Sequence, residues 1–214
     1  YCIEHLQDDD YCWVIRSVPR EGRLPVSVSK GGTVTRQLPI ADDIQALVDD
    51  VVSAHGRLDI MMANAGIVHA SDPLELAEED YDRVMAVNLK GVFLCGQIAG
   101  RQMIKQEPDA DGQRGVIINM SSCQAVIVIP EIAPYVMSKG GINQWTKALG
   151  IRLAPEGIRV NAIGPGSIAT EMFKTVSSTP EKMRAIMSRT PMKRWGRPSE
   201  VGALVRPNTD ATAL

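Results

Sequence analysis

Alternation between continuous apolar runs and amphipathic segments constrains this chain more than any other feature of its sequence. Hydrophobic residues recur every three or four positions over 44–52, which predicts an amphipathic helix. Unbroken apolar runs are typical of strands that are buried on both faces. Three runs that are mostly apolar, interrupted by single polar or charged residues, stand at 58–62, 115–120 and 158–163. The alternation predicts an α/β fold with a doubly wound parallel sheet and helices on both faces.

Capping and breaking residues give the expected bounds of the helices. Asp42 or Asp43 caps the first helix and Gly56 ends it, while Asp72 with Pro73 opens the next. Further helices are expected over 91–104, from about Pro134 to Leu153, over parts of 167–192 between prolines, and over 198–205. A short β-prone run at 11–15 predicts one more strand.

Small polar residues or glycines follow each of the three predicted strands. The segments are Asn64-Ala65-Gly66, Ser121-Ser122 and Pro165-Gly166. In open parallel sheets, ligands bind outside the carboxyl ends of the strands. The three breaks therefore predict one crevice at a single edge of the sheet.

Tyr135 and Lys139 are four residues apart in the helix predicted after the second break, so they share one face. A phenol normally ionises near pH ~10. An ammonium group held close lowers that pKa and makes a usable proton donor and acceptor. On spacing alone the two side chains could equally be ordinary surface neighbours.

The ordered motifs of the chain resemble those of the short-chain dehydrogenase/reductase family. The resemblance covers about residues 41–206 and is closest to 3-oxoacyl-carrier-protein reductases and sugar or polyol dehydrogenases. Its motifs stand at Asn64-Ala65-Gly66, Val87-Asn88-Leu89-Lys90-Gly91, Ile118 to Ser122, Tyr135-x-x-x-Lys139, Arg159 to Ile163 and Pro165 to Thr170. The family has a Rossmann-type three-layer sandwich and transfers hydride between a nicotinamide cofactor and a carbonyl or secondary alcohol.

The resemblance implies four catalytic residues. Tyr135 would be the general acid for ketone reduction and the base for alcohol oxidation, and Lys139 would lower its pKa. Ser122, which fits the family's interval better than Ser121, would hydrogen-bond the substrate oxygen. Asn88, a polar residue on an apolar helix stripe, would hold a water in a proton relay; a satisfied core amide is the alternative.

The resemblance also implies the cofactor site, which would take NADP or NAD. Asn64, Ala65 and Gly66 would line the adenosine side, and Lys139 and Tyr135 would face the nicotinamide ribose. The nicotinamide itself would be positioned by Pro165, Gly166, Ile168 and Thr170. Thr170 could also be the N-cap of the next helix.

The first 40 residues match the family poorly. The glycine-rich phosphate loop, T-G-x-x-x-G-x-G, does not occur in the sequence, so we expect it and the first strand to lie upstream of Tyr1, and the last strand to be missing too. In that register Arg16 stands where the family separates NADP from NAD and gives a weak preference for NADP, although a solvated strand-end charge is equally expected there.

Composition narrows the possible partners and cellular locations of the protein. The chain has 214 residues, 44% of them hydrophobic, and a net charge of -2 without a basic block, so we expect one catalytic domain over 1–214 and no nucleic-acid or membrane partner. Four scattered cysteines and no His/Cys/Asp cluster favour a cytoplasmic protein without a metal. A homotetramer or dimer is expected from the family, with 167–195 as a substrate lid. The alternative to an enzyme is an incomplete chain that acts as an assembly partner.

Overall fold

The computed structural model describes residues 40–177 and 179–209, and their core is a parallel three-stranded sheet. Strands β1 (Ile60–Ala63), β2 (Gly115–Met120) and β3 (Ile158–Ile163) lie in the order β1-β2-β3. Ile60 pairs with Val116, and Gly115 pairs with Ile158. The expected strand at 11–15 lies outside the described residues.

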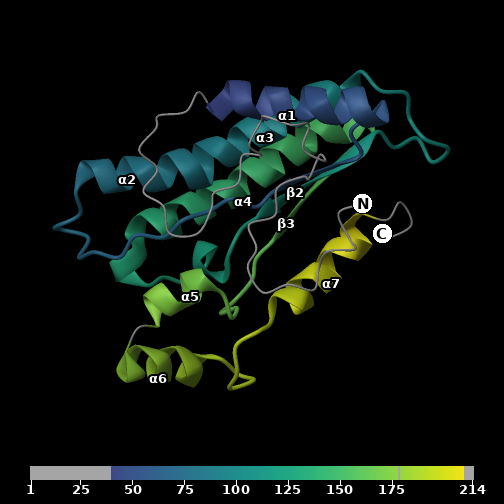
Figure 1. Cartoon of the computed structure of the whole chain (residues 1–214). Coiled ribbons are helices and arrows are strands. Elements are labelled where there is room, and N and C mark those ends of the chain that lie inside the picture. The colour runs from purple at the N-terminus through teal and green to yellow at the C-terminus, as the bar shows by residue number, and fades with distance from the viewer. Residues whose placement is uncertain (1–39, 178, 210–214) are drawn as a thin grey trace.

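Helices cover both faces of this sheet, as the sequence predicts (Figure 1). On one face lie α1 (Ile40–His55), α3 (Gly91–Ile104) and α4 (Ala133–Leu153); on the other lies α7 (Pro198–Thr209). β2 separates the two apolar layers, because Ile117 packs with the α1, α3 and α4 side chains while Val116 and Ile118 pack toward α7. The fold is therefore an α/β sandwich of three layers.

Two helix starts differ from the prediction. α1 begins at Ile40, so Asp42 and Asp43 lie within its first turn. Their negative charges stabilise the helix there, because the N-terminal end of the helix dipole is positive. Asp72 caps only a turn, through its carboxylate and the Leu74 amide at 2.8 Å, and α2 (Glu78–Met85) begins six residues later. A single cap cannot start a helix where no apolar face follows it at once.

β1 begins two residues later than the sequence predicts. The backbone of Leu58 is bonded to the side chain of Gln106 instead of to the sheet, with Leu58 N donating at 2.7 Å and Gln106 Nε2 donating to Leu58 O at 3.0 Å. Leu58 is nevertheless 2% exposed. An apolar run therefore marks burial here but not strand pairing.

A π-helical turn, η1 (Ala86–Lys90), joins α2 to α3. Gly91 N donates to Ala86 O, five residues back. The sequence pattern did not predict this turn, which carries the buried Asn88. Single π turns within α-helices are frequent at functional sites.

The C-terminal part of the chain returns to the sheet through two short helices. α5 (Glu171–Val176) and α6 (Pro180–Arg189) follow β3, each with a threonine at its N-cap. α7 then packs Val201 and Val205 against Val116, Ile118 and Ile163. No helix in the described ranges is both long and apolar enough to cross a membrane.

Two glycines allow a matched test of the fold. Gly157 turns the chain into β3 with a φ of +71°, and a Cβ there would lie 2.2 Å from Gly112 O, whereas a Cβ on Gly140 in α4 would meet nothing within 4 Å. We expect Gly157→Ala to lower the free energy of unfolding by about 2 kcal/mol or more. Gly140→Ala should raise it by about 0.5–1 kcal/mol, because alanine favours the helix.

Urea denaturation of both variants, followed by far-UV circular dichroism, measures these changes. Equal stabilities for Gly157→Ala and the unmodified chain would contradict the backbone geometry at the start of β3.

Candidate active site

The carboxyl ends of β1, β2 and β3 meet at one edge of the sheet, and the three predicted breaks lie there together. Ser121 N donates to Ile163 O at 2.8 Å, and Cys123 N donates to Pro165 O at 2.9 Å. A Cβ on Gly164 would lie 3.6 Å from the backbone of Ser122. The segments after β2 and β3 are therefore in direct contact.

Helix α4 presents Tyr135 and Lys139 to this edge. Lys139 is 3% exposed, and its Nζ donates to Met120 O, the last residue of β2, at 2.7 Å. The same Nζ lies 5.4 Å from the centroid of the Tyr135 ring. Burial lowers the pKa of Lys139 to about 8, because the interior disfavours the charged ammonium.

The direction of the Tyr135 pKa differs from the expectation. Burial raises the pKa of this phenol above its ordinary value, and the hydrogen bond with Ser122 lowers it less. Lys139 stands over the face of the ring and gives its hydrogen bond to the strand, so it does not offset the loss of solvation. In this structure Tyr135 is therefore held as the neutral phenol.

The two serines after β2 have separate environments. Ser121 Oγ donates to Asn143 Oδ1 at 2.6 Å and is tied to α4. Ser122 lies beside Tyr135, where its side chain lowers the pKa of the phenol, and its Oγ accepts from Gln124 N at 3.1 Å, which caps the short helix η2 (Cys123–Ala125). Only Ser122 is placed beside the phenol.

Asn88 joins the loop after β1 to helix α4. It is fully buried, its Oδ1 accepts from Ile67 N at 2.8 Å, and its Nδ2 donates to Ile67 O at 2.8 Å and to Ser138 Oγ at 3.2 Å. Protein groups thus satisfy the hydrogen bonds of its amide, as expected if Asn88 is a core amide. The water-holding role stays a prediction.

The sequence reading missed two residues that complete this network. Ser138 is fully buried and donates to Tyr135 O at 2.7 Å while accepting from Asn88, and Asn143 accepts from Ser121. Asn143 is four residues beyond Lys139, so the helical spacing already placed it on the catalytic face of α4.

The residues predicted for a nicotinamide cofactor fit such a group in their size and polarity. A Cβ on Gly66 would lie 3.5 Å from Asn88 Oδ1 and 3.7 Å from Lys139 Nζ, so the glycine keeps the loop Asn64–Gly66 open beside the ammonium. A Cβ on Gly166 would meet no atom within 4 Å, which leaves the segment Pro165–Gly166 accessible. The two segments follow β1 and β3, the strands on either side of β2, and Lys139 bonds the last residue of β2.

Ile168 and Thr170 start the segment that leads into α5. Ile168 forms a bridge with Gly196, where a Cβ would lie 2.6 Å from Ile168 Cδ1. Thr170 Oγ1 accepts from Phe173 N at 3.3 Å and is thus the N-cap of α5. A cofactor role for Thr170 would be additional to this one.

Glu200 anchors the returning segment to α7, a role that the sequence reading missed. Its carboxylate accepts from Arg194 at 2.7 and 3.0 Å and from Arg197 N, next to the first residue of α7, at 2.7 Å. These bonds lower the pKa of Glu200 to about 2. Pro198 at the first helical position and Glu200 two residues later are helix-start signals that were visible in the sequence, and the bond from Arg197 N to Glu200 is the glutamate half of a capping box.

Arg16 lies outside the described residues, so its position relative to the site is not described. Within 40–177 and 179–209, no group of three or more His, Cys, Asp or Glu side chains is arranged to hold a metal ion.

Comparisons with known proteins agree with this geometry. The family described as enoyl-(acyl carrier protein) reductase matches residues 32–206. An uncharacterized oxidoreductase of Thermotoga maritima is 40% identical over 166 residues, which are 76% of this chain and 64% of that protein. A 3-oxoacyl-(acyl-carrier-protein) reductase of the same organism is 39% identical over 77% of this chain and 63% of its own length.

A solved structure shares the fold. The gluconate 5-dehydrogenase of Burkholderia cenocepacia, in complex with NADP and tartrate, superposes with a TM-score of 0.70 at 32% identity, over 77% of this chain and 63% of that one. The chain thus spans somewhat less than two thirds of the length of these relatives. With its sheet, its ordered motifs and these matches, the chain belongs to the short-chain dehydrogenase/reductase family.

Proposed function

We propose that this chain is an oxidoreductase that transfers a hydride between NADP or NAD and a carbonyl or secondary-alcohol substrate. The observation that carries the proposal is the convergence of Tyr135, Lys139 and Ser122 at the carboxyl end of β2. The nicotinamide would supply or accept the hydride, and the protein would supply orientation and proton transfer.

Tyr135 is the proposed general acid. As the carbonyl carbon gains the hydride, its C–O π pair moves to oxygen, and that oxygen takes the proton from the phenol. The raised pKa of Tyr135 keeps the phenol protonated near neutral pH, which supports reduction. Alcohol oxidation needs the phenolate and is favoured at alkaline pH.

Ser122, Lys139 and Asn88 are the proposed partners of Tyr135. Ser122 would hydrogen-bond the substrate oxygen where charge develops, which its position beside the phenol supports. Lys139 would return a proton to the phenolate and hydrogen-bond the cofactor ribose. Asn88 would fix the loop after β1 relative to Lys139 through its bonds to Ile67 and Ser138. Its further proposed role is to hold a water in a proton relay.

The cofactor would lie along the carboxyl edge of the sheet. Asn64, Ala65 and Gly66 would contact its adenosine side, and the segment from Pro165 to Thr170 would position the nicotinamide. The weak preference for NADP rests on Arg16 and stays a prediction. The Burkholderia cenocepacia relative is in complex with NADP, which supports a cofactor with a 2′-phosphate for this chain.

The proposed substrate types follow the names of relatives: a 3-oxoacyl thioester, or a sugar or polyol. Residues 167–195 would form the lid over that substrate within one catalytic domain. We place the protein in the cytoplasm, which the free thiols of Cys95 and Cys123 support.

We also propose that two copies pair through the face formed by α2, η1 and α3. An apolar groove on this face is lined by Met85, Ala86, Leu89 and Phe93. Asp82 and Lys90 also line it, and two-fold pairing would oppose Asp82 to the partner's Lys90. A dimer, or a tetramer built from dimers, is the expected assembly.

Replacing the proposed acid tests the function directly. We expect Tyr135→Phe to lower kcat for NADPH-dependent carbonyl reduction by about 10²–10⁴-fold, because no proton is delivered to the substrate oxygen. Its Kd for NADPH should stay within about threefold, as the ring is kept. Absorbance of the reduced nicotinamide measures turnover, and NADPH fluorescence measures binding.

Tyr81→Phe, on α2, is the matched control and should leave kcat unchanged. Unchanged turnover in Tyr135→Phe would refute the assigned acid. Failure of the unmodified chain to bind NADPH at millimolar concentration would refute the enzymatic proposal as a whole.

Turnover should also depend on the charge of Lys139. The pKa of Lys139 is lowered to about 8, so the cation predominates below that pH and is lost above it. We expect kcat/KM for NADPH to be level from pH 6 to about 7.5 and to fall toward tenfold per pH unit above 8. A profile that stays level to pH 10 would show that the charge of Lys139 is not needed.

The pairing face can be tested by introducing a charge. Phe93 is 37% exposed on α3, and we expect Phe93→Asp to convert the assembly to monomers because it places a carboxylate in the apolar contact. Light scattering after size exclusion gives the mass. Leu74→Asp, in a loop outside this face, should leave the mass unchanged, and an unchanged mass for Phe93→Asp would argue against this interface.

A further inference from the structure

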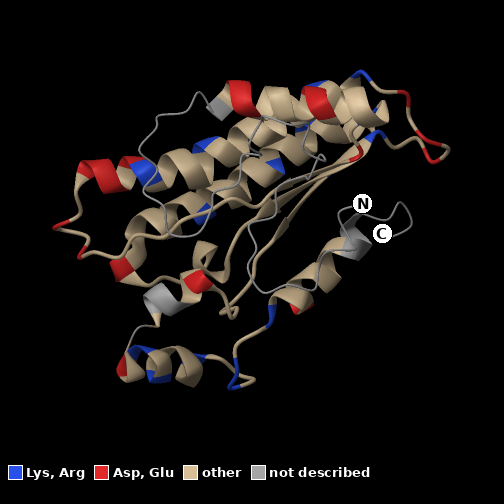
Figure 2. Ribbon diagram, in the orientation of Figure 1, with Lys and Arg blue, Asp and Glu red and all other residues tan. Residues whose placement is uncertain are grey.

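The contact between α4 and the sheet changes from polar to apolar along the helix. Near the end of α4, Leu149 and Leu153 are buried in the hydrophobic core. Nearer its start, the residues that meet the end of β2 are polar. β1 and β2 carry no charged residue (Figure 2), so β2 contributes neutral polar groups to this part of the contact. Burying such groups costs free energy unless they are hydrogen-bonded, so the core alone does not explain them.

Two bonds between side chains form the polar part of the contact. Asn119 Nδ2 donates to Thr146 Oγ1 at 2.9 Å, and Ser121 Oγ donates to Asn143 Oδ1 at 2.6 Å. Both residues of the β2 segment are buried, so water does not compete for their bonds. Asn119 Oδ1 has no hydrogen-bond partner among the described residues, which is a cost that this arrangement bears.

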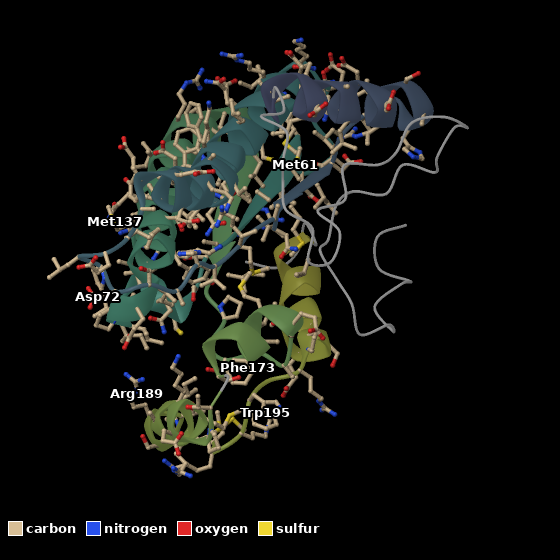
Figure 3. The ribbon with its side chains drawn as sticks, turned by 60° about the vertical axis from the view of Figure 1, so that its left-hand side comes forward. Met61, Asp72, Met137, Phe173, Arg189 and Trp195 are labelled. Carbon is tan, nitrogen blue, oxygen red and sulfur yellow. The ribbon has the colours of Figure 1, made fainter. Side chains whose placement is uncertain are left out.

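The bond to Asn143 is the one nearer the proposed active site. Tyr135, Lys139 and Asn143 follow each other at intervals of four in α4 and therefore share one face of the helix. Met137 lies at the outer surface of the helix (Figure 3) and is 53% exposed. The face that carries the catalytic pair is therefore also the face that is bonded to the end of β2.

Ser121 stands between the two groups that the catalytic pair contacts. The residue before it is Met120, whose carbonyl oxygen accepts from Lys139 Nζ at 2.7 Å. The residue after it is Ser122, which lies beside the Tyr135 phenol. Ser121 Oγ also lies 3.5 Å from Lys139 O. Holding Ser121 therefore holds both contacts of the catalytic pair at once.

A hydrogen bond fixes the position of a helix along a strand more closely than apolar packing does. Apolar contacts are non-directional, so leucines alone would allow α4 to settle at slightly different heights along β2. A donor and an acceptor 2.6 Å apart allow little displacement before their bond is lost. In an active site, a displacement of about 1 Å can lower the rate about 10²-fold.

We propose that Asn143 is a positioning residue of the active site. Through Ser121 it fixes the height of Tyr135 and Lys139 relative to the carboxyl end of β2, without touching substrate or cofactor. This inference rests on the proposed function and adds a residue to its machinery. The two consecutive serines then have different tasks, since Ser121 aligns the helix and Ser122 faces the substrate.

Two substitutions of Asn143 separate positioning from packing. Asn143→Leu removes the acceptor at nearly constant volume, and we expect kcat for the reduction of ethyl acetoacetate by NADPH to fall about 10–100-fold. KM for the ester should stay within about threefold, because its contacts remain. Asn143→Asp keeps an oxygen that accepts from Ser121 Oγ and should retain kcat within about threefold. A role in packing alone predicts the opposite order, because a half-buried carboxylate is costlier than a leucine.

Ionisation of Tyr135 gives a second measurement, which needs no turnover. Burial raises the pKa of this phenol, so less than half of it should be ionised at pH 10. Asn143→Leu should increase that fraction, because a loosened α4 admits water and the pKa falls toward its ordinary value. Asn143→Asp should not increase it, because the bond is kept and the added negative charge opposes the phenolate. Lys139 and Cys123, two titratable neighbours of the phenol, are present in every variant.

Absorbance of the phenolate band measures this ionisation, after subtraction of the same titration with Tyr135→Phe. Two further variants of α4 are controls. Thr146→Val removes the second polar bond, about one turn farther from the site, and should lower the urea midpoint while leaving kcat within about twofold. Gln144→Leu, at the exposed residue next to Asn143, should change neither. Circular dichroism of each variant confirms that it folds.

The outcomes separate the two proposals. Unchanged kcat or unchanged Tyr135 ionisation in Asn143→Leu, equal losses in Asn143→Leu and Asn143→Asp, or an equal loss of kcat in Thr146→Val would each overturn the positioning role. Absence of hydride transfer from NADPH in the unmodified chain would instead refute the proposed function, and the tyrosine titration would still decide whether Asn143 positions α4.

Discussion

The attachment of helix α4 to the end of strand β2 is the contact on which the proposed site depends. Two of the side-chain bonds that make it are Lys139 Nζ to Met120 O and Ser121 Oγ to Asn143 Oδ1, and Asn119 Nδ2 also donates to Thr146 Oγ1. β2 is the central strand of the described sheet and its least exposed one, so its carboxyl end is a fixed point. Any shift of α4 along the sheet would move Tyr135 away from Ser122 and break both bonds together.

The pattern of hydrophobic residues in the sequence predicted the parts of this structure that depend on burial. The apolar runs located β2 and β3 at their observed bounds, and the helix expected from about Pro134 to Leu153 is α4. The strand and helix bounds follow from short-range periodicity and from the parallel order of the strands, both of which a sequence records. The preference for Ser122 over Ser121 came from the family resemblance, and Ser122 is the serine that lies beside the phenol.

The features that the sequence did not reveal depend on competition between partners. Leu58 leaves the sheet because a glutamine 48 residues away bonds its backbone, and no local pattern shows that preference. The pKa of Tyr135 is a balance between burial and neighbouring charge, and its direction depends on where the Lys139 ammonium points. Spacing places two side chains on one face, but it does not fix which atoms meet.

The π turn at Ala86–Lys90 has a consequence for how sequences of this kind are compared. Val84, Asn88 and Val92 are buried at intervals of four residues, and in a straight α-helix each such step would rotate the side chain by about 40° away from the core. The wider turn takes up that rotation, so all three face inward. Helical periodicity counted without a break from α2 into α3 would therefore be about one residue out of register after Asn88, and it would assign the wrong side chains of α3 to the buried face.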